Sequence, residues 1–256
     1  MRRQRALAGA AVAACLVADV WTVALAANDP GASGAVATLT RVSTDVGLRT
    51  ATGGGTPEGQ PAPQTPRVVD RGDGHLRPVA MPEGALRTAT EGRRVRVGIE
   101  VEGGLPVEAT DFAAAVAATL SDERGWQGPG VKDRVRFVEV PPADLAKGAA
   151  VDVRIALASP ETTDRLCAPL QTRGQVSCHN GGRAVINLRR WQLGAEAYGA
   201  DLDGYRTYVV NHEVGHSLGH GHAYCSGPGE VAPVMMQQTY GLKGCTAWPW
   251  PSATSG

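Results

Sequence analysis

The chain has 256 residues, which is enough for one sizeable domain with appendages. Its 25 basic and 25 acidic side chains give a formal net charge of zero. This balance argues against a nucleic-acid partner or a charged membrane surface.

The first 26 residues are predicted to be a signal peptide or an N-terminal anchor. Arg2, Arg3 and Arg5 precede an apolar stretch from Ala6 to Ala18, and Ala24-Leu25-Ala26 offers a cleavage site between small residues. Cys15 could instead carry a lipid, but the apolar run continues beyond it, so we favour an ordinary position within the signal. We therefore expect a secreted or cell-envelope protein that meets the membrane only through this segment, if it is not cleaved.

Residues 27–66 are predicted to be a disordered linker, because glycine, proline and threonine dominate and little apolar material is available for burial. The remaining residues, 67–256, are predicted to form one domain. It begins with a strand over 94–101, whose polar and apolar residues alternate, and a helix over 112–120 with Asp111 as its N-cap. Three further strands are predicted over residues 135–140, 151–158 and 183–188.

A histidine-rich segment follows, from His212 to His222, and it predicts a metal site on a helix that begins near Asp203 or Gly204. Side chains four residues apart share a helix face, so His212 and His216 can bind one ion. Glu213 can then face a water at the metal without binding the metal itself.

The third ligand is either His220 or His222. In a continued helix, His220 would lie about 12 Å along the axis from His212, which is a poor route to tetrahedral geometry. Gly219 can end the helix, because glycine adopts left-handed backbone angles easily. The chain can then return His222 to the metal, so we favour His222 as the third ligand.

The pattern H-E-x-x-H-x-x-G-x-x-H over 212–222 resembles that of the metzincin clan of zinc endopeptidases. Those enzymes carry a methionine turn beneath the metal, and Met235 or Met236 can supply it here; we favour Met236, although either residue could instead be ordinary core packing. The clan likeness covers residues 203–236. It implies an α+β, metzincin-like (zincin) fold with a twisted mixed sheet, an active-site helix and a small irregular C-terminal subdomain. More widely, residues from about 66 to 251 resemble a secreted actinobacterial family described only as being of unknown function.

Four cysteines lie beyond the N-terminal segment, and an even number in an exported domain suggests two disulfides. Three pairings are possible, and the short intervening loops favour Cys167 with Cys178 and Cys225 with Cys245. The second bridge would hold the two ends of the segment that contains the methionine turn.

These features predict an exported, monomeric zinc metallopeptidase that acts on a protein or peptide with one catalytic Zn²⁺ and Glu213 as general base. Two alternatives stay open: a non-catalytic cell-envelope module stabilised by zinc, and a hydrolase of non-peptide cell-wall material. The residue that stabilises the oxyanion is not identified, because Gln237 and Gln238 stand where some metzincins have a tyrosine. Tyr240 is near enough to be tested in that role.

Overall fold

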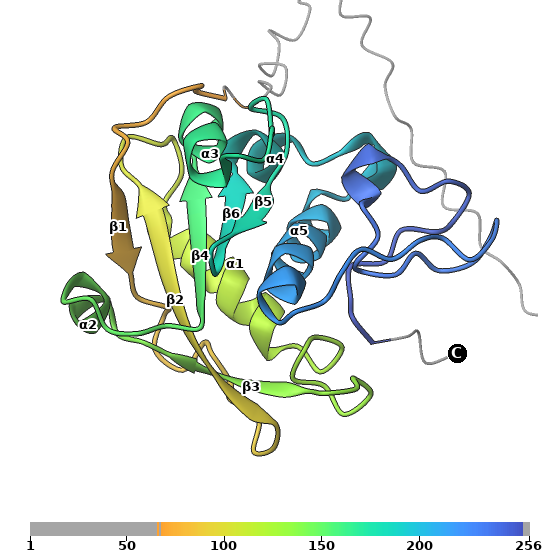
Figure 1. Cartoon of the computed structure of the whole chain (residues 1–256), viewed down its shortest axis with the longest axis horizontal. Helices are drawn as coiled ribbons and strands as arrows, with labels where there is room; N and C mark the ends of the chain where they lie inside the picture. Colours follow the sequence, from red (N-terminus) through yellow and green to blue (C-terminus); the bar gives the residue numbers. More distant parts are fainter. Residues whose placement is uncertain (1–65, 67, 253–256) are drawn as a thin grey trace, which may run out of the picture. The chain divides into compact units, whose positions relative to one another are not determined.

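A computed structural model describes residue 66 and residues 68–252, and the predicted signal segment, Cys15 and nearly all of the predicted linker lie outside this part. The described chain is a mixed α+β domain built on one twisted six-stranded sheet (Figure 1). Within it, no helix is both long enough and apolar enough to cross a membrane. The strands are β1 (Leu76–Val79), β2 (Arg93–Glu102), β3 (Val135–Glu139), β4 (Val153–Ala158), β5 (Cys178–Asn180) and β6 (Arg183–Asn187).

The sheet has the order β1-β2-β4-β6-β5, and β3 also pairs with β2. Strands β2, β3, β4 and β6 run parallel, whereas β1 and β5 are antiparallel. The long strand β2 makes this possible, because its first half pairs with β3 and its second half with β4. The antiparallel strand β5 forms one edge of the sheet, next to β6.

Helices cover both faces of the sheet. They are α1 (Ala109–Ser121), α2 (Pro142–Ala146), α3 (Pro160–Cys167), α4 (Leu188–Leu193) and α5 (Leu202–Ser217), with 3-10 turns η1 (Glu196–Tyr198) and η2 (Gln238–Tyr240). The alternating residues Val95, Val97 and Ile99 of β2 face the main core, to which α1 and α5 contribute. Helix α2 lies on the other face, where Leu145 packs over Gly98.

The four strands and the first helix predicted from the sequence are confirmed, to within two or three residues at each end. The predicted N-cap of α1 is wrong: Glu108 occupies that position, and Asp111 lies in the first turn, where its N–H already donates to the Glu108 carbonyl. Strands β1 and β5 and helices α2, α3 and α4 are absent from the prediction. Each has only three to eight residues, too few for a clear periodic pattern.

Beyond His222 the described chain is mostly irregular, with one 3-10 turn and an isolated bridge between Val231 and Thr246. The C-terminal residues pack back onto the helices. Asn211 of α5 donates to the Pro249 carbonyl at 3.0 Å, and the Arg124 guanidinium lies 4.2 Å from the centre of the Trp250 ring. The short segment after the third histidine is thus held against α5.

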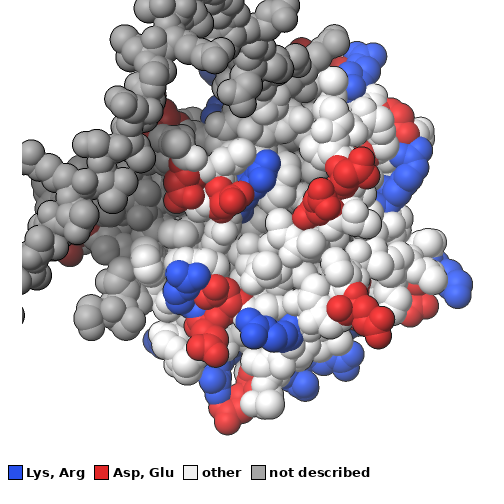
Figure 2. Space-filling model, turned by 180° about the vertical axis from the view of Figure 1, so that it is seen from behind, with Lys and Arg blue, Asp and Glu red and all other residues white. Residues whose placement is uncertain are grey.

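Charged side chains of both signs are mixed on the face shown in Figure 2. On the side opposite the view of Figure 1, acidic and basic residues alternate in small groups, and neither sign forms a continuous patch among the described residues visible there (Figure 2).

Candidate metal centre

Helix α5 carries two of the three predicted ligands. The Asp201 carboxylate caps it by accepting from the Gly204 N–H at 2.9 Å, so the helix starts slightly before the predicted position. Tyr205, Tyr208 and Val209 face the core and are almost completely buried. This apolar face fixes the rotation of α5, and His212 continues it one turn later, at the wall of a cleft.

Helix α5 ends at Ser217 with Leu218 as its C-cap, and Gly219 follows directly, where the sequence predicted the helix to stop. The Gly219 N–H donates to the His216 carbonyl, and the His220 N–H reaches back to the Gly215 carbonyl, each at 3.0 Å. These two bonds define a Schellman motif, which requires a left-handed residue between the helix and the reversing chain. Gly219 has a φ of +99°, a backbone angle that residues with a Cβ atom rarely adopt.

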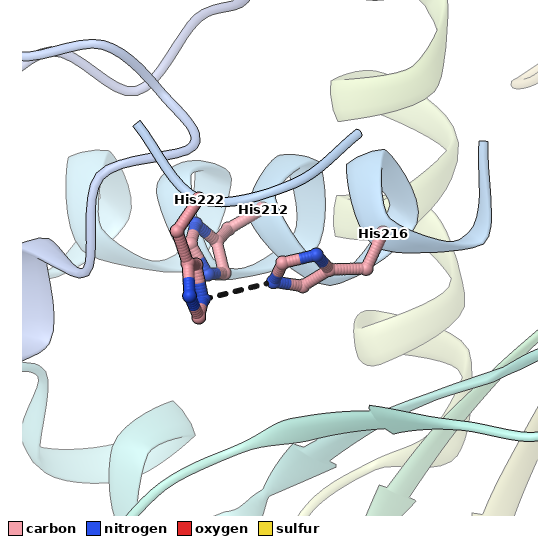
Figure 3. A group of neighbouring side chains, drawn as sticks. All are labelled: His212, His216 and His222. Carbon is pink, nitrogen blue, oxygen red and sulfur yellow. Dashed lines mark hydrogen bonds between the residues drawn. The ribbon is translucent and has the colours of Figure 1, made fainter. Parts of the chain in front are cut away.

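The reversal brings His222 back over α5, so that the three predicted ligands point toward one another (Figure 3). One ring nitrogen from each of His212, His216 and His222 lies within 4.8 Å of the others, which makes the group a possible metal site. The Nε2 atoms of His216 and His222 are 3.2 Å apart. Two nitrogens bound tetrahedrally at about 2.05 Å from one zinc would stand about 3.3 Å apart, so the spacing fits a single ion.

Backbone carbonyls orient two of these rings. His212 donates through Nδ1 to the Val234 carbonyl, and His216 donates through Nδ1 to the His220 carbonyl, both at 2.8 Å. Because a carbonyl only accepts, each Nδ1 carries the proton and each Nε2 keeps its lone pair for a ligand. His220 therefore contributes its backbone, while its imidazole stacks on Trp126 with ring centres 4.5 Å apart.

Burial disfavours the charged form of two of the three histidines. It lowers the pKa of His212 to about 4 and also lowers the pKa of His222, with a smaller contribution from His216 in both cases. Neutral imidazole is the form that binds metals. Burial also raises the pKa of Glu213 to about 8, so that this carboxyl group holds a proton near neutral pH in the metal-free protein.

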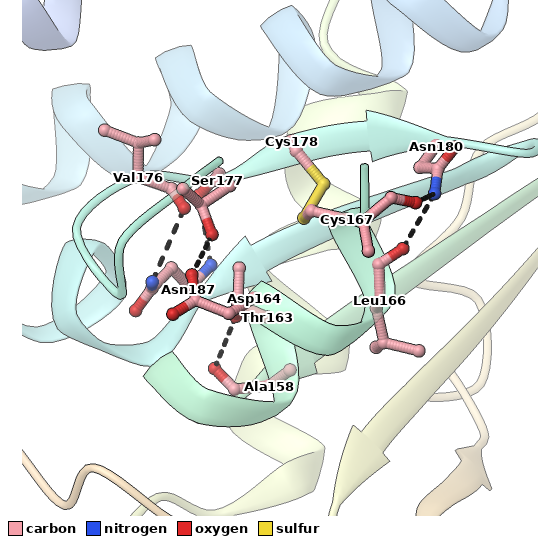
Figure 4. Close-up of a disulfide and its surroundings, with 12 residues drawn as sticks. Ala158, Thr163, Asp164, Leu166, Cys167, Val176, Ser177, Cys178, Asn180 and Asn187 are labelled. Atoms are coloured by element: carbon pink, nitrogen blue, oxygen red, sulfur yellow. Dashed lines mark hydrogen bonds between the residues drawn. A yellow bond between two sulfur atoms is a disulfide. The ribbon is translucent and has the colours of Figure 1, made fainter. Parts of the chain in front are cut away.

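The histidines and Glu213 line a cleft of about 370 Å³ between α5 and the segment that joins α3 to β5. That segment is closed by the predicted Cys167–Cys178 disulfide (Figure 4). The Cα atoms of the two cysteines are 6.1 Å apart. His179 of β5 also lines the cleft, and its ring centre lies 6.2 Å from that of His216. Its Nε2 is buried and has no hydrogen-bond partner among the described residues. Sequence reasoning missed His179, whose only signal was its position next to a bridged cysteine.

The methionine segment passes beneath α5. The Met235 thioether packs so closely on Gly215 that a Cβ added there would lie 2.4 Å from its sulfur. Met236 instead packs with Ala232 and Cys245 in a separate small cluster. Met235 is therefore the methionine that contacts α5, whereas the sequence favoured Met236 for the floor of the metal site. Two consecutive side chains point in different directions here, which a linear motif does not reveal.

The second predicted disulfide, Cys225–Cys245, is also confirmed, with Cα atoms 5.9 Å apart. It joins the chain just after His222 to the chain beyond the methionine segment. Between them, the Ala223 N–H donates to the Met235 carbonyl at 3.0 Å. The third histidine and the segment beneath the helix are thus held together by both a covalent bond and a hydrogen bond.

A family model described as "Protein of unknown function (DUF3152)" matches residues 62–249. The chain belongs to this family. The match spans the sheet, the three histidines and both disulfides, but the family description assigns no activity. No curated protein and no solved structure matches the chain.

For this DUF3152 protein, the function must therefore be argued from the site. The described residues combine three convergent imidazoles, one buried carboxyl group and an adjacent cleft. Such a donor set suits a borderline metal such as zinc, which prefers nitrogen ligands and tetrahedral geometry.

Proposed function

We propose that this protein is an exported zinc metallopeptidase of the metzincin type. The observation that carries the proposal is the histidine group, in which carbonyls hold the Nδ1 atoms of His212 and His216 and leave Nε2 free for one ion. These two residues and His222 would hold the metal. Three protein ligands leave one position for water or substrate, as in catalytic zinc sites, whereas structural sites recruit a fourth side chain.

Zinc in such a site supplies Lewis-acid chemistry, because it activates water and polarises a carbonyl oxygen. Glu213 supplies the proton transfer. Its carboxyl group lines the same cleft as the ligands, and we assign to it the removal of a proton from the attacking water and its delivery to the leaving amine.

Several features beyond the ligands support the metzincin assignment. The active-site helix lies on a twisted sheet, Gly219 ends the helix in a left-handed conformation, and Met235 lies beneath the helix at Gly215. The resemblance to that clan implies features of this kind. The two disulfides support export, because such bonds persist in oxidising compartments.

The proposal is tested by Glu213→Gln in the purified protein, with zinc content and the cleavage of a panel of denatured proteins as readouts. The variant should keep zinc and lose about 10²- to 10⁴-fold in cleavage rate, the usual contribution of a general base. Unchanged cleavage with zinc retained would exclude Glu213 from catalysis. Cleavage of peptidoglycan fragments but no proteins would favour the non-peptide hydrolase instead.

The ligand assignment has a matched control within the chain. His222→Ala should abolish stoichiometric zinc binding, whereas His220→Ala should retain it, since only the backbone of His220 supports the site. Loss of zinc from the second variant alone would contradict the ligand set.

A further inference from the structure

The cleft beside the histidines has an apolar rim. Four large apolar side chains are exposed in the described chain: Leu170, Leu193, Tyr224 and Tyr240. Two of them, Leu170 at 54% and Tyr240 at 71% exposure, line this one cleft although they are 70 residues apart in sequence. Exposed apolar groups that gather at a concave site mark a place where a ligand buries them.

The same cleft lacks fixed charge away from the metal centre. Apart from Glu213 and the histidines, its lining residues are neutral, among them Gln171, Val176 and Thr239. This neutrality is a local property, because a second hollow near α2 is lined by five charged residues. They are Arg94, Arg96, Glu139, Asp144 and Lys147. A charged ligand group entering the histidine cleft would lose its hydration without gaining a partner.

Both rim residues stand on firmly held segments. In the loop that contains Leu170, the Asp164 carboxylate accepts from the Gly174 N–H at 2.7 Å. The Asn187 N–H donates to the Ser177 hydroxyl at 3.0 Å (Figure 4). These bonds lie within or beside the loop closed by Cys167 and Cys178.

Next to Tyr240, the Thr239 hydroxyl lies 3.1 Å from the Tyr205 hydroxyl of α5. The rim is thus shaped before a ligand arrives, which reduces the ordering entropy of binding.

We propose that this cleft selects an uncharged, apolar side chain of a peptide, of the leucine or phenylalanine class, which Leu170 and Tyr240 cover beside the metal centre. The inference rests on the proposed function in that the occupant is a peptide. Burying one such side chain in the cleft should tighten peptide binding by about tenfold or more, relative to a peptide that leaves this side chain in water. A lysine or glutamate side chain would gain no such affinity, and its charged group would lose hydration without forming an ion pair.

The first test measures binding without turnover. Zinc-loaded Glu213→Gln protein is titrated calorimetrically with acetylated hexapeptide amides that differ only in a central leucine, lysine or glutamate. The leucine peptide should bind at least about tenfold more tightly than either charged peptide. Equal affinities, or no binding by any of the three, would overturn the inference.

The second test moves charge into the rim in the same background. Leu170→Lys should weaken the leucine peptide and strengthen the glutamate peptide, and Tyr240→Ala should weaken the leucine peptide. Leu193→Lys and Tyr224→Ala are the matched controls, because both residues are exposed and neither lines the cleft. Equal effects of the rim and control variants would assign the preference to some other surface. Since all four side chains are at least partly in solvent, zinc content and circular dichroism should stay unchanged.

Cleavage by the unmodified protein separates this inference from the proposed function. A binding preference for leucine without any cleavage would support the apolar site and contradict the peptidase. Cleavage at random positions, with equal peptide affinities, would do the reverse.

Discussion

Replacing Gly219 by alanine isolates the energy of one backbone conformation at the end of helix α5. A Cβ added at Gly219 would meet no atom within 4 Å, so contacts contribute nothing to the expected loss. The φ of +99° does contribute, because a residue with a Cβ costs roughly 1–2 kcal/mol in a left-handed conformation. Gly219→Ala should therefore lower the free energy of unfolding of the zinc-saturated protein by about 1–2 kcal/mol.

Gly221→Ala provides the control. Gly221, like Gly219, lies between His216 and His222, and a Cβ added there would also meet no atom within 4 Å. Its φ, however, is outside the left-handed region. Its replacement should leave stability unchanged or raise it by about 0.4–1 kcal/mol, by restricting the unfolded chain.

Urea unfolding of both variants, with and without zinc, measures these differences. If the metal-free Gly219→Ala variant relaxes the turn, part of the loss will appear as weaker zinc binding, by up to about 5- to 30-fold. A Gly219→Ala variant as stable and as tight for zinc as the unmodified protein would refute the role assigned to this turn. Equal losses from both variants would refute it as well.

Removal of zinc by a chelator should lower the melting temperature in calorimetry but leave a cooperative transition, because the main core does not depend on the metal. Zinc at 1,000 times its dissociation constant would add about 4 kcal/mol to the free energy of unfolding. Complete unfolding on chelation would favour structural zinc. Without metal, the raised pKa of Glu213 means that the folded protein binds this proton more tightly than the unfolded chain, so the stability that Glu213 contributes is fully present below about pH 4.5 and is lost as pH rises through about 8. At about 1.4 kcal/mol per pKa unit the fall amounts to several kcal/mol, and Glu213→Gln should abolish it in urea titrations at pH 5 and pH 9. Met235→Ala should cost about 2–5 kcal/mol and Met235→Leu less than about 1.5 kcal/mol in the same assay, and equal losses would contradict close packing beneath α5.

The parts of the site that the sequence predicted are those set by local geometry. The shared face of His212 and His216 follows from helical periodicity, and the helix end follows from the backbone freedom of Gly219. The disulfide pairings follow from short loops. These features depend on residues within about 20 positions of one another, so tertiary structure adds little to them.

The parts that escaped prediction depend on tertiary contacts. His179 reaches the cleft because the three-residue strand β5 pairs with the edge of β6, next to α5, and a strand that short has no periodic signal. Leu170 and Tyr240 share a cleft only because two distant loops are held against the sheet and the helix. The choice between Met235 and Met236 depends on the backbone angles of a turn.

The end of helix α5 depends on both local sequence and tertiary contacts, because Gly219 positions two of the proposed ligands. By reversing the chain, Gly219 allows His222 to return to α5. The same reversal places the His220 carbonyl 2.8 Å from Nδ1 of His216, and so fixes the proton of that imidazole and leaves its Nε2 for the metal. A substitution that straightens this turn would therefore disturb a ligand on the helix as well as the ligand beyond it. The return of His222 to α5 can be predicted from the spacing of Gly219 and the histidines in the sequence. The orientation of His216 by the His220 carbonyl is visible only in the hydrogen bonds of the folded turn.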